Sequence, residues 1–222
     1  MPVNRTGMDD EATTTDEQAA DAFARALAAQ AHAYGGALTA DARARLTAYF
    51  LLVRRWTPRL HLVAPCAPAE FATRHVLESL CALPHVAPGA HVLDVGSGAG
   101  LPLIPCLLAR ADLRGTLVEA SAKKAIFLRA ALGQLALRER ATVHAARFEQ
   151  TNAPPADYLT CRALERFTQT LPRLVRWSPA RTLLLFGGPT LREKIEELGL
   201  SYQAELLPKS EQRFLFVVNK AG

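Results

Sequence analysis

Apolar residues change their spacing along the chain near residue 90. Before that point they recur at helical intervals. One such stripe holds Leu46, Tyr49, Phe50, Val53 and Trp56. The pattern predicts three helices, over residues 16–33, after a capping Thr39, and over residues 68–83. Pro58 and Pro65 are expected to bracket a short non-helical link between the second and third helices.

After residue 90, short β-rich runs alternate with helical segments. We predict seven strands, over residues 90–95, 115–119, 141–145, 158–161, 182–186, 202–207 and 214–219. Helices are expected over residues 102–110, 122–137, 164–177 and 191–198. The alternation predicts an α/β fold with a doubly wound, seven-stranded, mostly parallel sheet. Only residues 208–213 separate the last two strands, so we expect the sheet to end in an antiparallel hairpin.

The 222 residues divide into three expected parts. Half of them are apolar and 21% are charged, a composition that excludes a disordered or low-complexity chain. Residues 1–15 lack apolar periodicity and are expected to form an acidic disordered tail. Residues 16–88 should form a helical N-terminal region. Residues 89–222 should form the α/β domain that carries the chemistry.

Charge is unevenly distributed. The chain has 26 Lys and Arg against 21 Asp and Glu, but the first 21 residues hold six of the acids and one of the bases. The remainder is therefore about +10, which is compatible with a polyanionic partner such as nucleic acid. Cysteine and histidine spacings match neither a disulfide framework nor a metal site. We expect a cytoplasmic monomer with no membrane span and no metal.

Three alternating glycines, Gly96, Gly98 and Gly100, follow the first predicted strand. In a first βα turn, glycines let the backbone turn tightly and approach a ligand closely. The dinucleotide fingerprint would need glycine where Leu101 stands. Asp94, just before the glycines, would repel a pyrophosphate but suits a sulfonium ligand that carries an ammonium group. The pattern favours S-adenosylmethionine over NAD, with a plain glycine-rich turn as the alternative.

Two further positions fit an adenosine ligand. Glu119 ends the second predicted strand, 23 residues after Gly96, where a carboxylate can accept both ribose hydroxyls. Phe148 and Glu149 follow the third strand, where an adenine could stack or form a hydrogen bond. A solvated strand-end glutamate is the alternative for Glu119 taken alone.

Taken together, these residues resemble the family of bacterial 16S ribosomal RNA guanine-N7 methyltransferases known as RsmG or GidB. The resemblance runs from about residue 39 to residue 219. Its main carriers are residues 74–80 (RHVLESL), 94–102 (DVGSGAGLP), 119–129 (EASAKKAIFLR) and 161–163 (CRA). It implies a class I S-adenosylmethionine-dependent methyltransferase fold, Rossmann-like, with a helical N-terminal extension. The implied target is a guanine in the 530 loop of small-subunit ribosomal RNA.

The resemblance also assigns residues. It implies cofactor contacts at Gly96, Leu101, Phe148, Glu149 and Arg162. Three positions depart from the family pattern. His61-Leu-Val-Ala stands where the family has Asn-Leu-Thr-Ala, Glu78 stands for Asp, and Phe186 stands for the lysine of Leu-Lys-Gly. These departures fall at positions where the family would bind the acceptor RNA.

Methylation at guanine N7 needs no general base, because N7 carries a lone pair and no proton. The transfer is an in-line displacement governed by positioning. Cations that hold the RNA backbone are therefore the expected functional groups. The candidates are Arg74, His75, Lys123, Arg147 and Arg162, of which Arg147 and Arg162 are the candidates for positioning the reactants. Phe148, Tyr158 and Phe186 are the aromatic residues near strand ends that could stack on a base.

Three other hypotheses remain open at this stage. Cys161, at the end of the fourth predicted strand, could be a nucleophile toward a pyrimidine C6 for methylation at C5. A buried packing cysteine is the commoner alternative. The chain could also be a non-catalytic RNA-binding relative that keeps the cofactor pocket. A small-molecule methyltransferase is disfavoured because no insertion interrupts the domain after Glu119.

Overall fold

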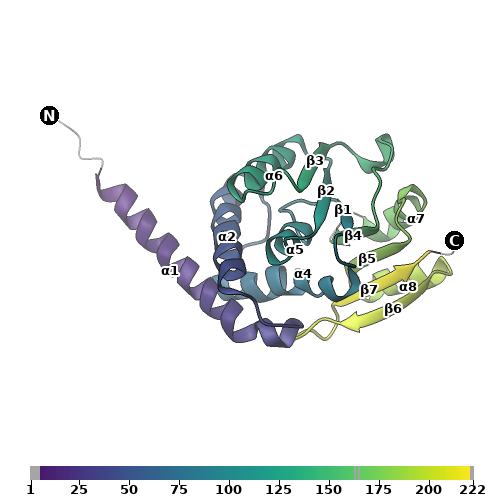
Figure 1. Ribbon diagram of the computed structural model, residues 1–222, viewed down its shortest axis with the longest axis horizontal. Helices are drawn as coiled ribbons and strands as arrows, with labels where there is room; N and C mark the ends of the chain where they lie inside the picture. Colours follow the sequence, from purple (N-terminus) through teal and green to yellow (C-terminus); the bar gives the residue numbers. More distant parts are fainter. Residues whose placement is uncertain (1–5, 163, 165, 221–222) are drawn as a thin grey trace.

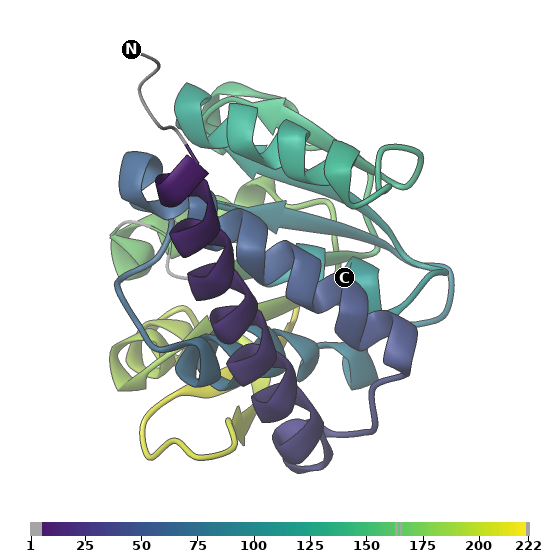
Figure 2. The ribbon, with the colours of Figure 1, turned by 90° about the vertical axis from the view of Figure 1, so that its left-hand side faces the viewer.

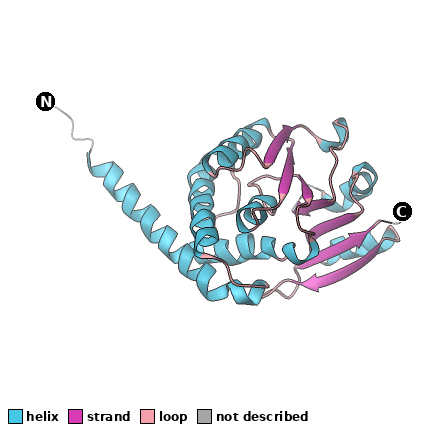
Figure 3. Ribbon diagram, in the orientation of Figure 1, coloured by secondary structure: helices cyan, strands magenta, loops and turns pink. Residues whose placement is uncertain are grey.

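The computed structural model describes residues 6–162, 164 and 166–220. Its centre is one seven-stranded sheet in the order β3-β2-β1-β4-β5-β7-β6 (Figures 1 and 3). The strands are β1 (His91–Val95), β2 (Arg114–Glu119), β3 (Ala141–Ala145), β4 (Tyr158–Arg162), β5 (Thr182–Gly187), β6 (Ser201–Leu206) and β7 (Phe214–Asn219). The predicted seven strands are confirmed, each to within one residue at either end.

The five strands β1 to β5 are mutually parallel, and β7 runs antiparallel to both β5 and β6. The connecting helices are α5 (Leu103–Ala109), α6 (Ala122–Gln134), the 3-10 turn η4 (Phe148–Gln150), α7 (Phe167–Trp177) and α8 (Pro189–Glu197). The strand order reverses direction between β1 and β4. In open α/β sheets, ligands bind beyond the carboxyl ends of the strands at this switch point.

Alternate residues of each strand face opposite sides of the sheet and fill two hydrophobic cores. One core holds Val92 and Leu117 together with side chains of α5 and α6. The other holds Leu93 and Cys161 together with side chains of α7 and α8. The strands therefore read as apolar runs, as expected of a sheet covered on both faces.

The N-terminal helices cover the α5 and α6 side of the sheet. They are α1 (Thr6–Gln30), η1 (Ala31–Tyr34), α2 (Ala40–Leu60), α3 (Pro68–Glu70), the π-helical stretch η2 (Phe71–Leu77), α4 (Glu78–Leu80) and η3 (Leu83–His85). Figure 2 shows α1 and α2 crossing in front of the domain. The rings of Phe23 and Phe50 stack at 4.6 Å between centroids and join α1 to α2. The expected cap at Thr39 is confirmed, since the Ala42 N–H donates to its hydroxyl at 3.1 Å.

Several predicted helix boundaries are wrong, and two helices end three residues early, at Leu80 and at Gln134 instead of residues 83 and 137. Helix α1 begins at Thr6 rather than at residue 16, so only residues 1–5 of the expected disordered tail lie outside the described residues. Helix α2 continues through Pro58 to Leu60, although proline has no N–H to donate to the carbonyl of residue 54.

Helix α7 begins at Phe167 instead of residue 164. Arg166 adopts a left-handed conformation with φ of 50°, which a helix cannot include. Leu164 therefore belongs to the loop that leaves β4. Ala163, the last residue of the predicted Cys-Arg-Ala motif, lies outside the described residues.

Candidate functional site

A cleft of about 970 Å³ opens beyond the carboxyl ends of β1, β2 and β4. Its walls come from the glycine loop after β1, the end of β2, the η4 segment, and the loop between β4 and α7. The helical N-terminal region supplies the remaining wall through residues 62–64 and His75. The cleft occupies the switch point of the sheet, which is the place expected for a ligand in this architecture.

The three loop glycines have different surroundings. Gly98 lines the cleft with φ of +54°, and a Cβ built on it would have only the Gly96 carbonyl oxygen nearby, at 3.8 Å. Gly96 also lines the cleft, but its Cβ would lie 2.6 Å from Leu164 Cδ1. Gly100, with φ of +89°, would drive a Cβ into the side chain of Ile104. Glycine at this position is therefore required by the packing of Ile104, and the cofactor contact of Gly100 stays a prediction.

Asp94 lies beneath the glycine loop and does not line the cleft. It is fully buried, and Thr160 Oγ1 donates to its Oδ1 at 2.8 Å. Its Oδ2 has no hydrogen-bond partner among the described residues. Burial raises the pKa of this carboxyl to about 7. No surface of Asp94 reaches the cleft, and its contact with the ammonium group of a ligand stays a prediction.

The Glu119 carboxylate lies at the mouth of the cleft and bridges the glycine loop and the start of α6. Its Oε2 accepts a hydrogen bond from the Gly98 N–H at 2.8 Å, and its Oε1 accepts one from the Ser121 N–H at 2.7 Å. The carboxylate lines the cleft and is 7% exposed. The sequence placed Glu119 at a strand end, and the structure adds that it holds the glycine loop against the start of α6.

The η4 segment forms the next wall. Phe148 is buried, and its ring packs edge-on against Trp177 at 5.3 Å between centroids. Glu149 lies 4.0 Å from the Arg173 guanidinium. Arg147 is exposed and lines the cleft beside them. The predicted grouping of Arg147, Phe148 and Glu149 at this edge is present.

Arg162, at the end of β4, is fixed from the helical region. Its Nη2 donates to Glu78 Oε2 at 2.9 Å and to the Arg74 carbonyl at 2.5 Å, and its Nη1 donates to the His75 carbonyl at 3.4 Å. It also lies over the Phe186 ring, at 5.7 Å from the centroid. Phe186 is buried core, so the prediction that it could stack on a base is wrong.

His75 lines the cleft, but it is not the cation that was predicted. Burial, with help from the charges of Arg162 and Arg74, lowers its pKa to about 4. The imidazole is therefore neutral at pH 7. Its ring lies 5.0 Å from the Phe71 ring.

This shift predicts a pH-dependent stability. A folded-state pKa of about 4 against about 6.5 in the unfolded chain means that His75 favours the folded state less as the pH falls from 6.5 toward 4. Between pH 7 and pH 5, the wild type should lose about 2 kcal/mol through this group. His75→Gln should remove that part of the loss. Urea unfolding of both proteins at the two pH values measures it, and parallel losses would contradict the assignment.

Two other predicted cations lie away from the cleft wall. Arg74 is exposed, and its Nη1 pairs with Glu70 at 2.6 Å. Lys123 is exposed on α6, and its neighbour Lys124 lines the cleft instead. A shift of one residue on a helix turns the side chain by about 100°, so the sequence could not choose between the two lysines.

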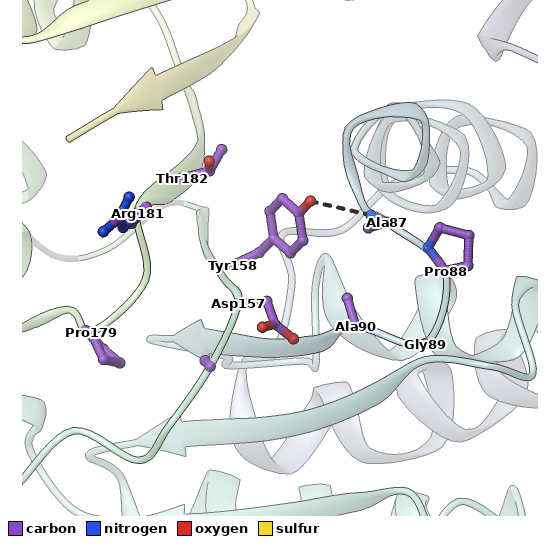
Figure 4. A pocket seen from close by; sticks show the side chains of 10 residues that line it. Ala87, Pro88, Gly89, Ala90, Asp157, Tyr158, Pro179, Arg181 and Thr182 are labelled. Atoms are coloured by element: carbon purple, nitrogen blue, oxygen red, sulfur yellow. Dashed lines mark hydrogen bonds between the residues drawn. The ribbon is translucent and has the colours of Figure 1, made fainter. Parts of the chain in front are cut away.

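Neither Cys161 nor Tyr158 lines the cleft. Cys161 is fully buried in the core on the α7 side, and burial raises the pKa of its thiol well above the ordinary range. The hypothesis of a nucleophilic Cys161 is therefore wrong, because the nucleophile must be an accessible thiolate. Tyr158 begins β4 and lines a second pocket of about 450 Å³ at the opposite end of the sheet, where its hydroxyl accepts from the Ala87 N–H (Figure 4).

Several residues that line the cleft were not predicted from the sequence. Arg166 and Arg173 line the cleft together with Lys124, and residues 62–64 form the opposite wall. The left-handed backbone that places Arg166 has no sequence signal of its own. Tyr49, which was read only as part of an apolar stripe, donates from its buried hydroxyl to the Ala99 carbonyl at 2.9 Å. The helical region therefore supports the glycine loop directly.

Within the described part of the chain, no group of three or more His, Cys, Asp and Glu side chains could hold a metal ion. Among the same residues, no helix is both long and apolar enough to cross a membrane.

Comparisons with known proteins agree with this geometry. The model of the GidB family, described as rRNA small subunit methyltransferase G, matches residues 42–216. A protein called ribosomal RNA small subunit methyltransferase G from Xanthomonas campestris pv. campestris (strain B100) is 40% identical over 195 residues, 86% of each chain.

Two solved structures share the fold at 16% identity. An O-methyltransferase family 2 protein from Planctomyces limnophilus has a TM-score of 0.56 over 82% of this chain and 65% of its own. A SAM-dependent methyltransferase from Aquifex aeolicus has a TM-score of 0.51 over 64% of this chain and 89% of its own. With the seven-stranded sheet, they confirm the predicted Rossmann-like methyltransferase fold.

Proposed function

Because the chain belongs to the rRNA small subunit methyltransferase G family, GidB, we propose that it methylates N7 of a guanine in 16S ribosomal RNA. The donor is S-adenosylmethionine, and the 530 loop is the proposed target region. The observation that carries the proposal is the arrangement of Gly98 and Glu119 at the mouth of a cleft at the switch point of the sheet.

The cleft suits the cofactor by its shape and its donors and acceptors. The open space beside Gly98 is one that a Cβ would begin to fill, so the backbone there leaves room for a ligand. Gly96, Gly98 and Leu101 would hold the methionyl part. Glu119 retains lone pairs for the ribose hydroxyls, and Phe148 and Glu149 would border the adenine. Asp94 supports the loop from below, because its backbone carbonyl accepts a hydrogen bond from Ser97 Oγ at 3.0 Å.

When bound, S-adenosylmethionine supplies a methyl group carried by a cationic sulfur. The chain's own task is to orient the purine and exclude water from the cleft. No residue need remove a proton, since guanine N7 has none. Arg162 is held rigidly at the wall, and the neutral His75 adds a polar ring without adding charge. Arg162 and Arg147 therefore act by positioning.

A basic rim would hold the RNA. The cleft is lined by Lys124, Arg147, Arg166 and Arg173. The exposed residues Lys123 and Arg74 are sequence neighbours of the cleft residues Lys124 and His75. Glu149 offsets part of this charge at Arg173. Phosphate contacts of this kind make RNA affinity fall steeply as salt concentration rises.

The test is direct methylation. The purified protein is incubated with radiolabelled S-adenosylmethionine and, separately, with small ribosomal subunits, naked 16S RNA, transfer RNA and protein. The expected result is label in 16S RNA and one chain break after borohydride and aniline treatment, which detects 7-methylguanine. Cofactor binding with no labelled RNA would instead favour a non-catalytic RNA-binding relative.

Cys161→Ser separates N7 methylation from covalent pyrimidine chemistry. Because Cys161 is buried away from the cleft, we expect the methylation rate to stay within about tenfold of the wild type. The rate is measured with excess enzyme, after thermal unfolding establishes that the variant is folded. Loss of all turnover in a folded variant, with label in 5-methylcytosine, would contradict the proposed chemistry.

A further inference from the structure

A fully buried carboxylate joins two arginines from distant parts of the chain. Glu78 Oε2 accepts from Arg162 Nη2 at 2.9 Å. Glu78 Oε1 accepts from Arg213 Nε at 3.0 Å and from Arg213 Nη2 at 2.7 Å. Glu78 begins α4, Arg162 ends β4, and Arg213 directly precedes β7. One side chain thus connects the helical region to two parts of the sheet.

Stability alone is a poor explanation for this cluster. Taking a carboxylate and the Arg162 guanidinium out of water carries a desolvation penalty that their attraction often fails to exceed. The Arg162 and Glu78 side chains are 15% and 0% exposed, so both meet that penalty. Apolar side chains of similar volume would fill the same space without it. A functional reason for the cluster is therefore sought in Arg162, the one member of the three that lines the cleft.

That member is Arg162. It lines the cleft, yet both of its terminal nitrogens point to groups of the helical region: the Glu78 carboxylate and the carbonyls of Arg74 and His75. The carbonyls carry only partial charge. Glu78 is therefore the one full negative charge bonded to this guanidinium among the described residues.

We propose that Glu78 is a positioning residue for methyl transfer, which holds Arg162 at the cleft wall and offsets its charge beside the acceptor purine. This inference rests on the proposed function. The N7 lone pair forms the new nitrogen–carbon bond, and the electron pair of the broken carbon–sulfur bond stays on sulfur. Positive charge passes from sulfur to the purine, and no proton moves. A guanidinium without its counter-ion would oppose that transfer of charge.

The experiment is a double-mutant cycle in the full chain. Single-turnover methylation of small ribosomal subunits is measured for the wild type, Glu78→Gln, Arg162→Lys and the double variant. We expect about a tenfold loss for each single variant and about the same tenfold loss for the double, because Glu78 acts through Arg162. A purely structural Glu78 would lower the unfolding midpoint without this dependence of the rate on Arg162.

Controls separate the outcomes. Asp112→Asn breaks the ion pair with Arg110 near the start of β2 and should leave the rate unchanged. Cofactor affinity should change less than about twofold in Glu78→Gln and in Asp112→Asn. If Glu78→Gln fails to fold, Arg213→Gln replaces it, with about a threefold loss that disappears in the Arg162→Lys background.

An unchanged rate in folded Glu78→Gln, or a hundredfold loss in the double variant, would overturn the inference and leave the proposed function intact. If Arg213→Gln has to replace Glu78→Gln, the inference is overturned by an unchanged rate in Arg213→Gln. It is also overturned if the losses of Arg213→Gln and Arg162→Lys add in the double variant. A wild-type protein that labels no ribosomal RNA would overturn the proposed function itself, and this inference with it.

Discussion

Gly98→Val abolishes S-adenosylmethionine binding, with an expected loss of affinity of more than about a hundredfold. A Cβ at residue 98 would project into open space of the cleft, since only the Gly96 carbonyl oxygen lies within 4 Å of it. The two further methyl carbons of valine would occupy the volume assigned to the ligand. Valine also strains the backbone at φ of +54° and so disturbs the N–H that donates to Glu119. Calorimetric titration with the cofactor and with its demethylated product measures the loss.

A matched variant separates strain from obstruction. Gly199 has a similar φ of +63°, a Cβ there would meet nothing within 4 Å, and it lies between α8 and β6, away from the cleft. Gly199→Val should lower the unfolding midpoint to a similar extent and leave cofactor affinity unchanged. Wild-type affinity in a folded Gly98→Val protein would remove this loop from the cofactor site.

Glu119→Ala should weaken cofactor binding by about 1–3 kcal/mol, equivalent to roughly five- to 150-fold in affinity, the order of a charge-assisted hydrogen bond. The variant removes the acceptor proposed for the ribose hydroxyls. It also frees the N–H groups of Gly98 and Ser121, which the carboxylate now fixes at 2.8 and 2.7 Å. Glu119→Gln keeps one acceptor oxygen and should fall between the alanine variant and the wild type. The same titration measures all three.

A ligand change separates the ribose contact from loop support. The 2′-deoxy form of the demethylated product should bind the wild type several-fold more weakly than the ordinary product. Glu119→Ala should bind the two forms equally, because the group that distinguishes them is gone. If Glu119→Ala kept the full preference for the ordinary product, the ribose assignment would be wrong and Glu119 would act through the loop alone.

The strands and the glycine loop were predictable because their signals are local. A strand's apolar run and its bounding turn residues are contained in six to eight positions. The glycine pattern needs only the loop itself, because the spacing of Gly96, Gly98 and Gly100 reflects backbone conformations that few other residues adopt. The end of α2 at Leu60, beyond Pro58, and the start of α7 after Arg166 were missed, because packing and backbone strain there override local preference.

The cleft was less predictable, because its members are distant in sequence. Nothing near Glu78 in the chain indicates that it bonds to Arg162 and Arg213, which lie 84 and 135 residues away. The choice of Lys124 over Lys123 depends on the rotation of α6 about its axis. These facts exist only once the helices and the sheet have packed.

The order of the strands along the chain, the loop after β1 and the acid at the end of β2 follow from local sequence, since periodicity and motif spacing are properties of neighbouring residues. Which side chains meet the cleft, and in which charge state, depends on how distant segments pack. This packing buries Asp94 and Cys161, and it makes His75 neutral. Burial and charge–charge distance are set by packing between distant segments, so no local pattern could encode them.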